Sequence, residues 1–291
     1  MILKIVIVTL IILLVIVLFI SKWENNHYII KKYEIDTKLD KPVTFAFLSD
    51  FHCKEYGRNN ERIIKELKDN NVDFICIGGD LLIGEKNASY KNAVNLLKGI
   101  TKYWTVYYAY GNHEGRLERH EEKYGTKMKE YLRDIYEAIG DNKANIYFLK
   151  DKSVTLSQQN IIISGIDIDD EYYKKFRKQN MPEKYLEDKI GNPDNNAYNI
   201  LLAHHPKYFN VYRKYGSDLV LSGHYHGGAV RIPGIGGIIS TDGRIFPKND
   251  RGIYKSDKTT MIVSGGLGGH TINIRVFNRP ELVIVNLKNR C

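Results

Sequence analysis

The sequence predicts an α/β fold in which two β-sheets pack together and helices cover their outer faces. Short apolar runs alternate with stretches of helical periodicity through residues 43–139. Further along the chain, residues 145–287 contain apolar runs separated by turns, as in hairpins. Alternating strands and helices followed by hairpins are typical of a layered sandwich. A strongly apolar stretch precedes all of these elements.

The apolar stretch at residues 2–20 contains Lys4 as its only charged residue. About 19 helical residues span close to the ~30 Å hydrocarbon core of a bilayer. A buried core helix is rarely apolar on every face. A cleaved signal peptide would need a shorter run and a small-residue cleavage site, which FISKWENN does not offer. We therefore expect an uncleaved transmembrane helix, with Trp23 in the headgroup layer.

The predicted boundaries are an anchor at residues 1–22, a juxtamembrane linker at 23–41 and one folded domain at 42–291. The flanking lysines do not fix the orientation of the anchor. Because an N-terminal anchor resembles an export signal, we expect a single-pass protein of the cell membrane with its folded domain outside the cytoplasm. Within the linker, residues 27–36 show some alternation and are expected to form an edge strand.

The composition of the chain limits its possible binding partners only weakly. The chain has 291 residues and a formal charge of +9. This charge favours an anionic partner such as a phosphate substrate, nucleic acid or acidic lipid, or else it simply keeps the surface soluble. Three cysteines are too few for a disulfide framework. We expect Cys76 to be buried, and Cys53 either lies near the site described below or points away from it.

The first half of the domain reads as strand, loop and helix in repeated order. Apolar runs predict strands that end at Asp50, Asp80 and Asn112. Helical spacing predicts helices between and after these strands, at residues 61–70, 90–100 and 117–139.

The second half predicts more strands and one polar insertion. The strands are expected at residues 145–151, 154–157, 161–166, 199–203, 218–222, 259–267, 271–277 and 281–287. Residues 168–196 form the insertion, which is either a solvated helix or a cap that touches substrate or membrane. The residues that suggest a cap are Tyr172, Tyr173, Lys174, Lys175, Phe176 and Arg177.

Side chains that bind metals follow these apolar runs in a fixed order. Because strand carboxyl ends in α/β sheets gather binding groups from distant segments, we expect these side chains to converge. Oxygen and imidazole ligands without cysteine suit a pair of hard-to-borderline divalent ions. The candidates are Asp50, His52, Asp80, Asn112, His204, His224 and His226.

Taken singly, the motifs differ in strength. DFH at residues 50–52 could instead contain an Asp that caps the next helix, and GGD at residues 78–80 could be an ordinary turn. GNHE at residues 111–114 is more specific, although an Asn in a left-handed turn would explain it too. GHYHGG at 223–228 is the strongest, because flanking glycines let two imidazoles approach neighbouring ions closely. Of two adjacent histidines, we assign His204 as a ligand and expect His205 to lie behind it or face solvent.

Together, these motifs resemble the calcineurin-like metallophosphoesterase family over about residues 43–286. The surrounding sequence (LSDFH, LLAHHP, RIPGIGG, NRPE) looks most like its membrane-anchored bacterial subgroup. The resemblance implies a four-layer α/β-β/α sandwich, the metallo-dependent phosphatase fold, with a dimetal centre at the sheet edge. It assigns one ion to Asp50, His52, Asp80 and His226, and the other to Asp80, Asn112, His204 and His224, with Asp80 as the bridge.

The resemblance also implies that His113 is not a ligand but lies beside the substrate, where it stabilises the phosphoryl oxygens or protonates the leaving group. In many family phosphatases an Asp three residues after the GD aspartate orients this histidine. Here the position holds Ile83, so the orienting group is open, with Glu114 and Glu85 nearby in sequence. This departure weakens the expectation of protein-phosphatase activity.

The sequence thus predicts a metal-dependent phosphoric ester hydrolase, phosphodiesterase-like, that uses two divalent ions (Mn, Fe or Zn). The expected substrate is a phosphodiester or pyrophosphate, membrane-associated or nucleotide-linked. The alternatives are a phosphomonoesterase or nuclease on the same fold, or a non-catalytic metal-binding membrane protein. Nucleic acid is not the expected substrate because no array of aromatic and basic residues is evident, and no obligate protein partner is predicted.

Overall fold

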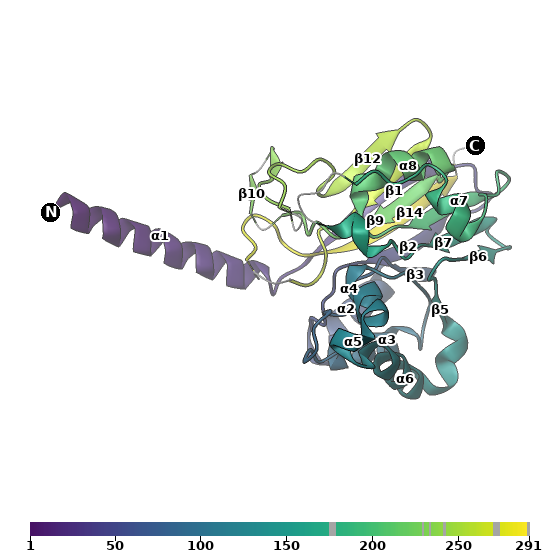
Figure 1. Ribbon diagram of the computed structural model, residues 1–291, viewed down its shortest axis with the longest axis horizontal. Coiled ribbons are helices and arrows are strands. Elements are labelled where there is room, and N and C mark those ends of the chain that lie inside the picture. The colour runs from purple at the N-terminus through teal and green to yellow at the C-terminus, as the bar shows by residue number, and fades with distance from the viewer. Residues whose placement is uncertain (175–178, 229, 233, 241–242, 270–273, 290–291) are drawn as a thin grey trace.

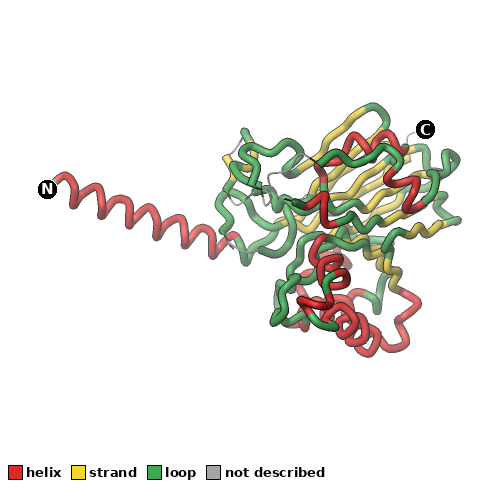
Figure 2. Tube along the Cα trace, viewed as in Figure 1, coloured by secondary structure: helices red, strands yellow, loops and turns green. Residues whose placement is uncertain are grey.

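The computed structural model describes residues 1–174, 179–228, 230–232, 234–240, 243–269 and 274–289. It shows two six-stranded sheets packed face to face, with helices on both outer faces (Figure 1). A long N-terminal helix projects away from this body (Figure 2). The predicted four-layer sandwich is therefore confirmed.

The first sheet has the order β1-β14-β2-β3-β4-β5. β14 is antiparallel to β2 and parallel to β1, and β2 to β5 are mutually parallel. β1 is an edge strand inside the range predicted as the linker, so this stretch ties the N-terminal helix to the sheet. The bounds are β1 Ile29–Thr37, β2 Val43–Leu48, β3 Phe74–Ile77, β4 Thr105–Tyr108, β5 Ile146–Phe148 and β14 Glu281–Asn289.

The second sheet has the order β12-β13-β9-β8-β7-β6. Its four central strands are parallel, and the two edge strands run antiparallel to their neighbours. The bounds are β6 Lys152–Leu156, β7 Ile161–Gly165, β8 Tyr198–Leu202, β9 Leu219–Ser222, β12 Gly252–Ser256 and β13 Thr259–Val263. A separate two-stranded ribbon joins β10 (Arg231–Ile232) and β11 (Gly236–Gly237).

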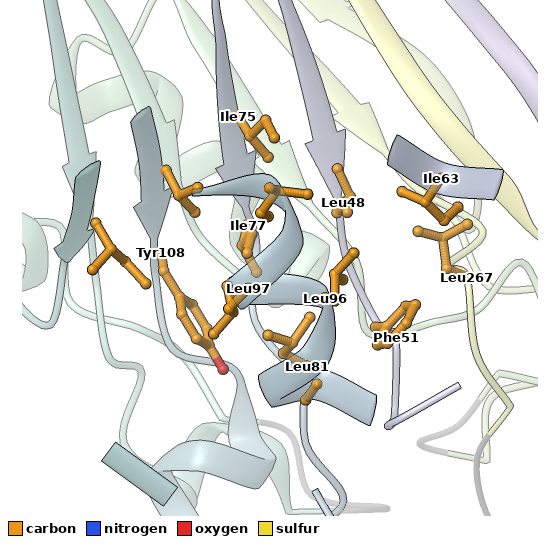
Figure 3. Close-up of a cluster of buried hydrophobic side chains, with 14 of the residues drawn as sticks. Leu48, Phe51, Ile63, Ile75, Ile77, Leu81, Leu96, Leu97, Tyr108 and Leu267 are labelled. Atoms are coloured by element: carbon orange, nitrogen blue, oxygen red, sulfur yellow. The ribbon is translucent and has the colours of Figure 1, made fainter. Parts of the chain in front are cut away.

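Buried apolar side chains fill three interfaces between the four layers. Inward-facing residues of both sheets, such as Phe45 and Ile163, meet in the middle. The other face of the first sheet packs against helices, where Leu96 and Leu97 lie over Ile75 and Ile77 (Figure 3). On this side lie α2 Glu61–Asp69, α3 Lys91–Ile100, α4 Asn112–Arg119, α5 Glu121–Tyr124 and α6 Lys127–Ile139.

The outer face of the second sheet is covered by α7 (Tyr185–Ile190) and α8 (Phe209–Tyr215). The predicted insertion belongs to this layer, because Tyr172 and Leu186 are buried against the sheet. The prediction of a solvated helix is therefore wrong: the aromatic residues of this segment supply core. Lys175, Phe176 and Arg177 lie outside the described residues.

α1 spans Ile2–Glu24, and its 23 residues have a mean hydropathy of 3.4 over the most apolar window, none of which is buried. By length and composition it can cross a membrane. Its C-terminal end is fixed to the domain: Arg275 N–H donates to Ser21 Oγ over 3.0 Å, and Asn278 N–H donates to Glu24 Oε2 over 2.9 Å.

The structure differs from one strand prediction and locates two of the cysteines. The strand expected at residues 271–277 does not form in its described part, residues 274–277, which has a single bridge between Val276 and Val230. Those residues instead supply backbone groups that bind the end of α1. Cys76 is fully buried, as predicted. Cys53 packs against the core between the first sheet and its helices.

Candidate metal centre

The candidate side chains meet at one edge of the sandwich. Each follows the carboxyl end of β2, β3, β4, β8 or β9. Three groups of their ligand atoms lie within 4.8 Å of one another: Asp50 with His52 and His226, His52 with Asp80 and His113, and Asp80 with His204 and His224. All of these side chains are largely buried. The structure thus brings together the carboxylates and imidazoles that the sequence singled out.

Asp80 lies at the centre of the cluster. Its Oδ2 is 3.1 Å from His204 Nε2, 3.8 Å from His113 Nε2 and 4.0 Å from His52 Nε2. A carboxylate with imidazoles on two sides can ligate two ions at once, so this geometry fits a bridging ligand.

Asp50 forms the second half of the cluster. Its Oδ1 is 3.3 Å from His226 Nε2, and His226 Nε2 is 3.1 Å from His52 Nε2. These three ligand atoms come from two separate loops and lie close enough together to bind one cation.

The backbone at these positions is unusual. Five of the candidate ligands have left-handed φ angles: Asp50 (49°), His52 (46°), Asp80 (53°), His224 (70°) and His226 (53°). For a residue other than glycine this conformation costs of order 1–3 kcal/mol, and such residues cluster at functional sites. Here the left-handed residues follow the ends of β2, β3 and β9, where the candidate ligands gather.

Glycines allow the ligand loops to approach each other. A Cβ at Gly223 would lie 2.1 Å from Asp50 Oδ2, and one at Gly111 would lie 2.2 Å from Asp80 Oδ1. Any side chain at these positions would therefore collide with a candidate ligand. This explains physically why the GNH and GHxH motifs begin with glycine.

Hydrogen bonds orient the ligand atoms. His204 Nδ1 lies 2.7 Å from the Gly78 carbonyl oxygen, and His52 Nδ1 lies 3.0 Å from that of Leu82. Since a carbonyl only accepts, each Nδ1 carries the proton and, in the neutral ring, leaves the Nε2 lone pair facing the cluster. The Asp50 carboxylate accepts hydrogen bonds from the Ser49 hydroxyl and from the backbone N–H of His224.

The side chain of Asn112 also fits a metal centre. Asn112 Oδ1 is buried and, among the described residues, has no hydrogen-bond donor. A buried amide oxygen without a partner is costly unless a ligand satisfies it. Asn112 begins α4 directly after β4, so its side chain extends from the same sheet edge as the other candidates.

The pKa values reflect the crowded charges. Burial would raise the pKa of Asp50, but the imidazoles of His226 and His204 hold it well below its usual range. Burial would lower the pKa of His204, but Asp80 and Asp50 raise it to about 10. Burial, together with His204, lowers the pKa of His224 to about 3. In the metal-free site, the His204 imidazolium therefore lies against the carboxylates of Asp80 and Asp50.

Glu114 is a structural element of the site that the sequence did not reveal. Its fully buried carboxylate accepts hydrogen bonds from the backbone amides of Asp80 (2.9 Å), Leu82 (3.1 Å) and Gly111 (3.0 Å), and from Tyr108 Oη (2.8 Å). It thereby fixes the GGD loop against the GNH loop. The acidic residue after GNH hinted at a role, but only the fold shows which donors it meets.

The open question of which group orients His113 has an answer in the structure. Gly84 N–H donates to His113 Nδ1 over 2.5 Å. Glu114 is committed to other donors, and Glu85 is exposed. The described partner of His113 Nδ1 is therefore a backbone amide rather than a carboxylate.

The rings of His205 and Tyr173 pack beside the cluster, on the side of the second sheet. His205 is buried, so the expectation that it could face solvent is wrong. Its ring stacks on Tyr173 at 5.3 Å and lies 4.3 Å from the His224 ring. Tyr173 also contacts His224 at 5.1 Å, and its buried hydroxyl has no partner among the described residues. The predicted insertion thus reaches the metal-ligand cluster through Tyr173.

Comparison with known proteins places this fold and site in a family. Residues 43–228 match the calcineurin-like phosphoesterase family, and the chain belongs to it. It is 27% identical to the uncharacterized metallophosphoesterase YkoQ of Bacillus subtilis, over 83% of this chain and 82% of that protein. It is 22% identical to the UDP-2,3-diacylglucosamine pyrophosphatase LpxG of Chlamydia muridarum, over 90% of this chain and 91% of that protein.

Among solved structures, an archaeal phosphodiesterase has 14% identity and a TM-score of 0.38, over 77% of this chain and 84% of that one. The family and the clustered carboxylates and imidazoles define the class of protein: it is a metal-dependent phosphoester hydrolase.

Proposed function

We propose that this protein is a membrane-anchored, dinuclear-metal phosphoesterase that hydrolyses a phosphodiester or pyrophosphate bond. The observation that carries the proposal is the central position of Asp80 Oδ2, within 4.0 Å of imidazole nitrogens from three separate loops. One carboxylate shared between two sets of ligands is the arrangement that two-metal phosphate chemistry uses.

The proposed ligands divide into two sets. The first ion would be held by Asp50, His52, Asp80 and His226, and the second by Asp80, Asn112, His204 and His224. The otherwise unpaired Asn112 oxygen supports the second set. Mn²⁺, Fe²⁺ and Zn²⁺ all accept these donors, so the ligands alone do not select the metal. When bound, two divalent ions neutralise phosphoryl oxygens and acidify water for attack on phosphorus.

His113 is the proposed substrate-contacting residue. Because Gly84 N–H donates to Nδ1, the proton of the neutral ring is on Nε2, which points into the cluster 3.8 Å from Asp80 Oδ2. An Nε2–H in this position can donate to a phosphoryl or leaving-group oxygen. It stabilises charge that develops on that oxygen as the ester bond breaks.

The substrate class follows from two considerations. A relative that aligns with 90% of this chain is named as a UDP-2,3-diacylglucosamine pyrophosphatase, an enzyme for a nucleotide-linked, acylated substrate. In addition, α1 would hold the domain beside a bilayer, where lipid-linked phosphates lie. We therefore favour a membrane-associated or nucleotide-linked diester or pyrophosphate over a phosphoprotein.

We also propose that the folded domain lies outside the cytoplasm. Protease treatment of intact cells tests this topology. A domain that resists the protease would contradict it.

Hydrolysis of bis-p-nitrophenyl phosphate in Mn²⁺ tests the enzymatic proposal. The wild-type chain should release p-nitrophenol and hold about two ions per chain by elemental analysis. Asp80→Asn should lose metal and activity together, whereas His113→Ala should keep metal and lose most activity. Full activity in His113→Ala would contradict its assigned role.

The alternatives make different predictions in the same assay. A phosphomonoesterase would prefer p-nitrophenyl phosphate to the diester, and a nuclease would nick plasmid DNA. A non-catalytic metal-binding membrane protein would take up the ions but hydrolyse neither ester, and this outcome would overturn the proposed enzyme.

A further inference from the structure

A group of exposed apolar side chains lies outside α1 and apart from the core. It consists of Ile232, Ile235, Ile239, Ile245, Phe246 and Phe277, with exposed fractions between 37% and 71%. We call this group the loop surface. Elsewhere in the described part of the folded domain, the exposed large apolar side chains are the scattered Tyr103, Tyr136, Tyr147 and Ile253. Concentrated apolar exposure of this kind marks a surface that meets a partner or a membrane.

The loop surface is built onto the end of α1. Arg231 N–H donates to the Val276 carbonyl over 3.0 Å, which joins the β10–β11 ribbon to the segment that carries Phe277. The neighbours of Val276 and Phe277 bind α1: Arg275 to Ser21 and Asn278 to Glu24. Figures 1 and 2 show the β10 loop beside the end of α1, at the side of the domain that faces the helix.

The side chains at this junction suit the headgroup layer of a bilayer. Trp23 is half-exposed at the end of α1, and the guanidinium of Arg279 lies 5.1 Å from its ring. Trp and Arg gather where apolar and aqueous layers meet. Residues 5–20 of α1 carry no charge, so this boundary fixes where the hydrocarbon region would end.

The charges around the loop surface favour an anionic partner. Lys248 is exposed within the same segment, and the guanidinium of Arg279 lies at the junction with α1. Asp250 is buried and paired with Arg231. Apolar side chains with basic neighbours bind the surface of membranes that contain acidic lipids. A second copy of the chain, carrying the same basic residues, would gain no such attraction.

The loop surface is also connected to the candidate metal centre. Asn278 Nδ2 donates to the His226 carbonyl over 2.7 Å and to that of Gly228. Arg231 donates to the Gly227 carbonyl over 2.8 Å. The loop that carries His226 is therefore held by the same residues that support the loop surface and bind α1.

We infer that the loop surface is a second membrane-contact site, inserted beside α1 into the headgroup layer of an anionic bilayer. The inference rests on the proposed membrane anchor but not on the proposed chemistry. Its consequence is positional: the domain cannot rotate freely about α1, and the His226 loop stays close to the layer where membrane phosphates lie.

Depth-dependent fluorescence quenching tests this inference on the full chain. The protein, carrying Cys291→Ser and Ile235→Cys, is labelled with NBD and reconstituted in vesicles of three parts phosphatidylethanolamine and one part phosphatidylglycerol. Nitroxide lipids quench NBD that lies within the bilayer interface. We expect quenching at position 235 to be at least threefold stronger than at position 253, labelled in the same way through Ile253→Cys.

Position 253 is a matched control because Ile253 is also an exposed isoleucine, 40% accessible, but on edge strand β12. Ile245→Cys provides a second site on the loop surface, so that a local folding defect at 235 does not decide the result. NBD bound to native Cys53 is measured in Cys291→Ser alone and subtracted.

Equal quenching at positions 235, 245 and 253 would overturn the inference. A blue-shifted but unquenched probe at 235 and 245 would indicate burial against another copy of the chain and would also overturn it. Failure of the protein to float with vesicles would overturn the anchor as well. None of these readouts depends on turnover, so a failed diester assay would leave this inference standing.

Discussion

The backbone amide of Gly84 donates a hydrogen bond to Nδ1 of His113, over 2.5 Å. This contact fixes both the ring orientation and, in the neutral imidazole, the location of the proton on Nε2. A backbone donor does this without adding a negative charge to a site that already contains Asp50 and Asp80. A carboxylate partner would instead favour the imidazolium form.

Gly84→Ala should therefore reduce turnover without removing metal. An added Cβ would lie 3.0 Å from His113 Nδ1, so the ring would have to move by a few tenths of an ångström. Because a displacement of about 1 Å can cost about 100-fold, we expect this smaller shift to lower kcat for the diester by up to roughly 10-fold. Steady-state kinetics together with metal analysis would measure this.

A double-mutant cycle with His113→Ala provides the control for this prediction. If Gly84 acts through His113, the double variant should be no slower than His113→Ala alone. Additive losses would show that Gly84→Ala damages the site by another route.

Glu114→Gln should destabilise the metal-free protein by about 1–3 kcal/mol. The carboxylate accepts from three backbone amides and one hydroxyl, and a glutamine would turn an NH₂ group toward some of these donors. Urea unfolding in EDTA measures the loss. The exposed Glu85→Gln should stay within about 0.5 kcal/mol of wild type, and equal stability of both variants would contradict the role given to Glu114.

Tyr173→Phe should raise KM about five- to tenfold while leaving stability nearly unchanged. Its hydroxyl is buried beside the cluster without a described partner, so a substrate or its water is the expected one. Tyr208→Phe is a matched comparison, because Tyr208 Oη donates to the Tyr172 carbonyl over 2.8 Å. That variant should lose about 1 kcal/mol of stability instead. An unchanged KM in Tyr173→Phe would exclude substrate contact.

Metal binding at pH 8 should release at least one proton per chain, the proton that His204 carries. The pKa of His204, raised to about 10 by Asp80 and Asp50, keeps this imidazole charged below that pH in the metal-free protein. A ligand must be neutral, so the ion displaces the proton. His224, with its pKa lowered to about 3, releases none. Metal affinity should therefore rise with pH up to about 10.

Calorimetry in buffers of different ionisation enthalpy counts the released protons. A count near zero for the wild type would contradict the charged state assigned to His204. His205→Gln, a change outside the ligand set, should release as many protons as the wild type.

The convergence of the candidate ligands could be predicted because they follow a local rule. Asp50, Asp80 and Asn112 each follow an apolar strand, and parallel strands end at a common edge. The same rule is the reason for proposing His204 rather than His205 as a ligand. Hydrophobic periodicity likewise identified α1 and most strands, because burial on one face imposes a pattern that neighbouring residues carry.

The tertiary structure alone decided the contacts between segments far apart in the chain. Gly84 is 29 positions from His113, and Glu114 is 34 positions from Asp80; neither pairing leaves a periodic trace in the sequence. Tyr173 reaches His205 only because its segment packs on the second sheet. In the described residues 274–277, where a strand was expected, the backbone amide of Arg275 instead binds Ser21 of α1. Local order depends on adjacent residues, whereas the partner of a buried polar group depends on which loops the fold brings together.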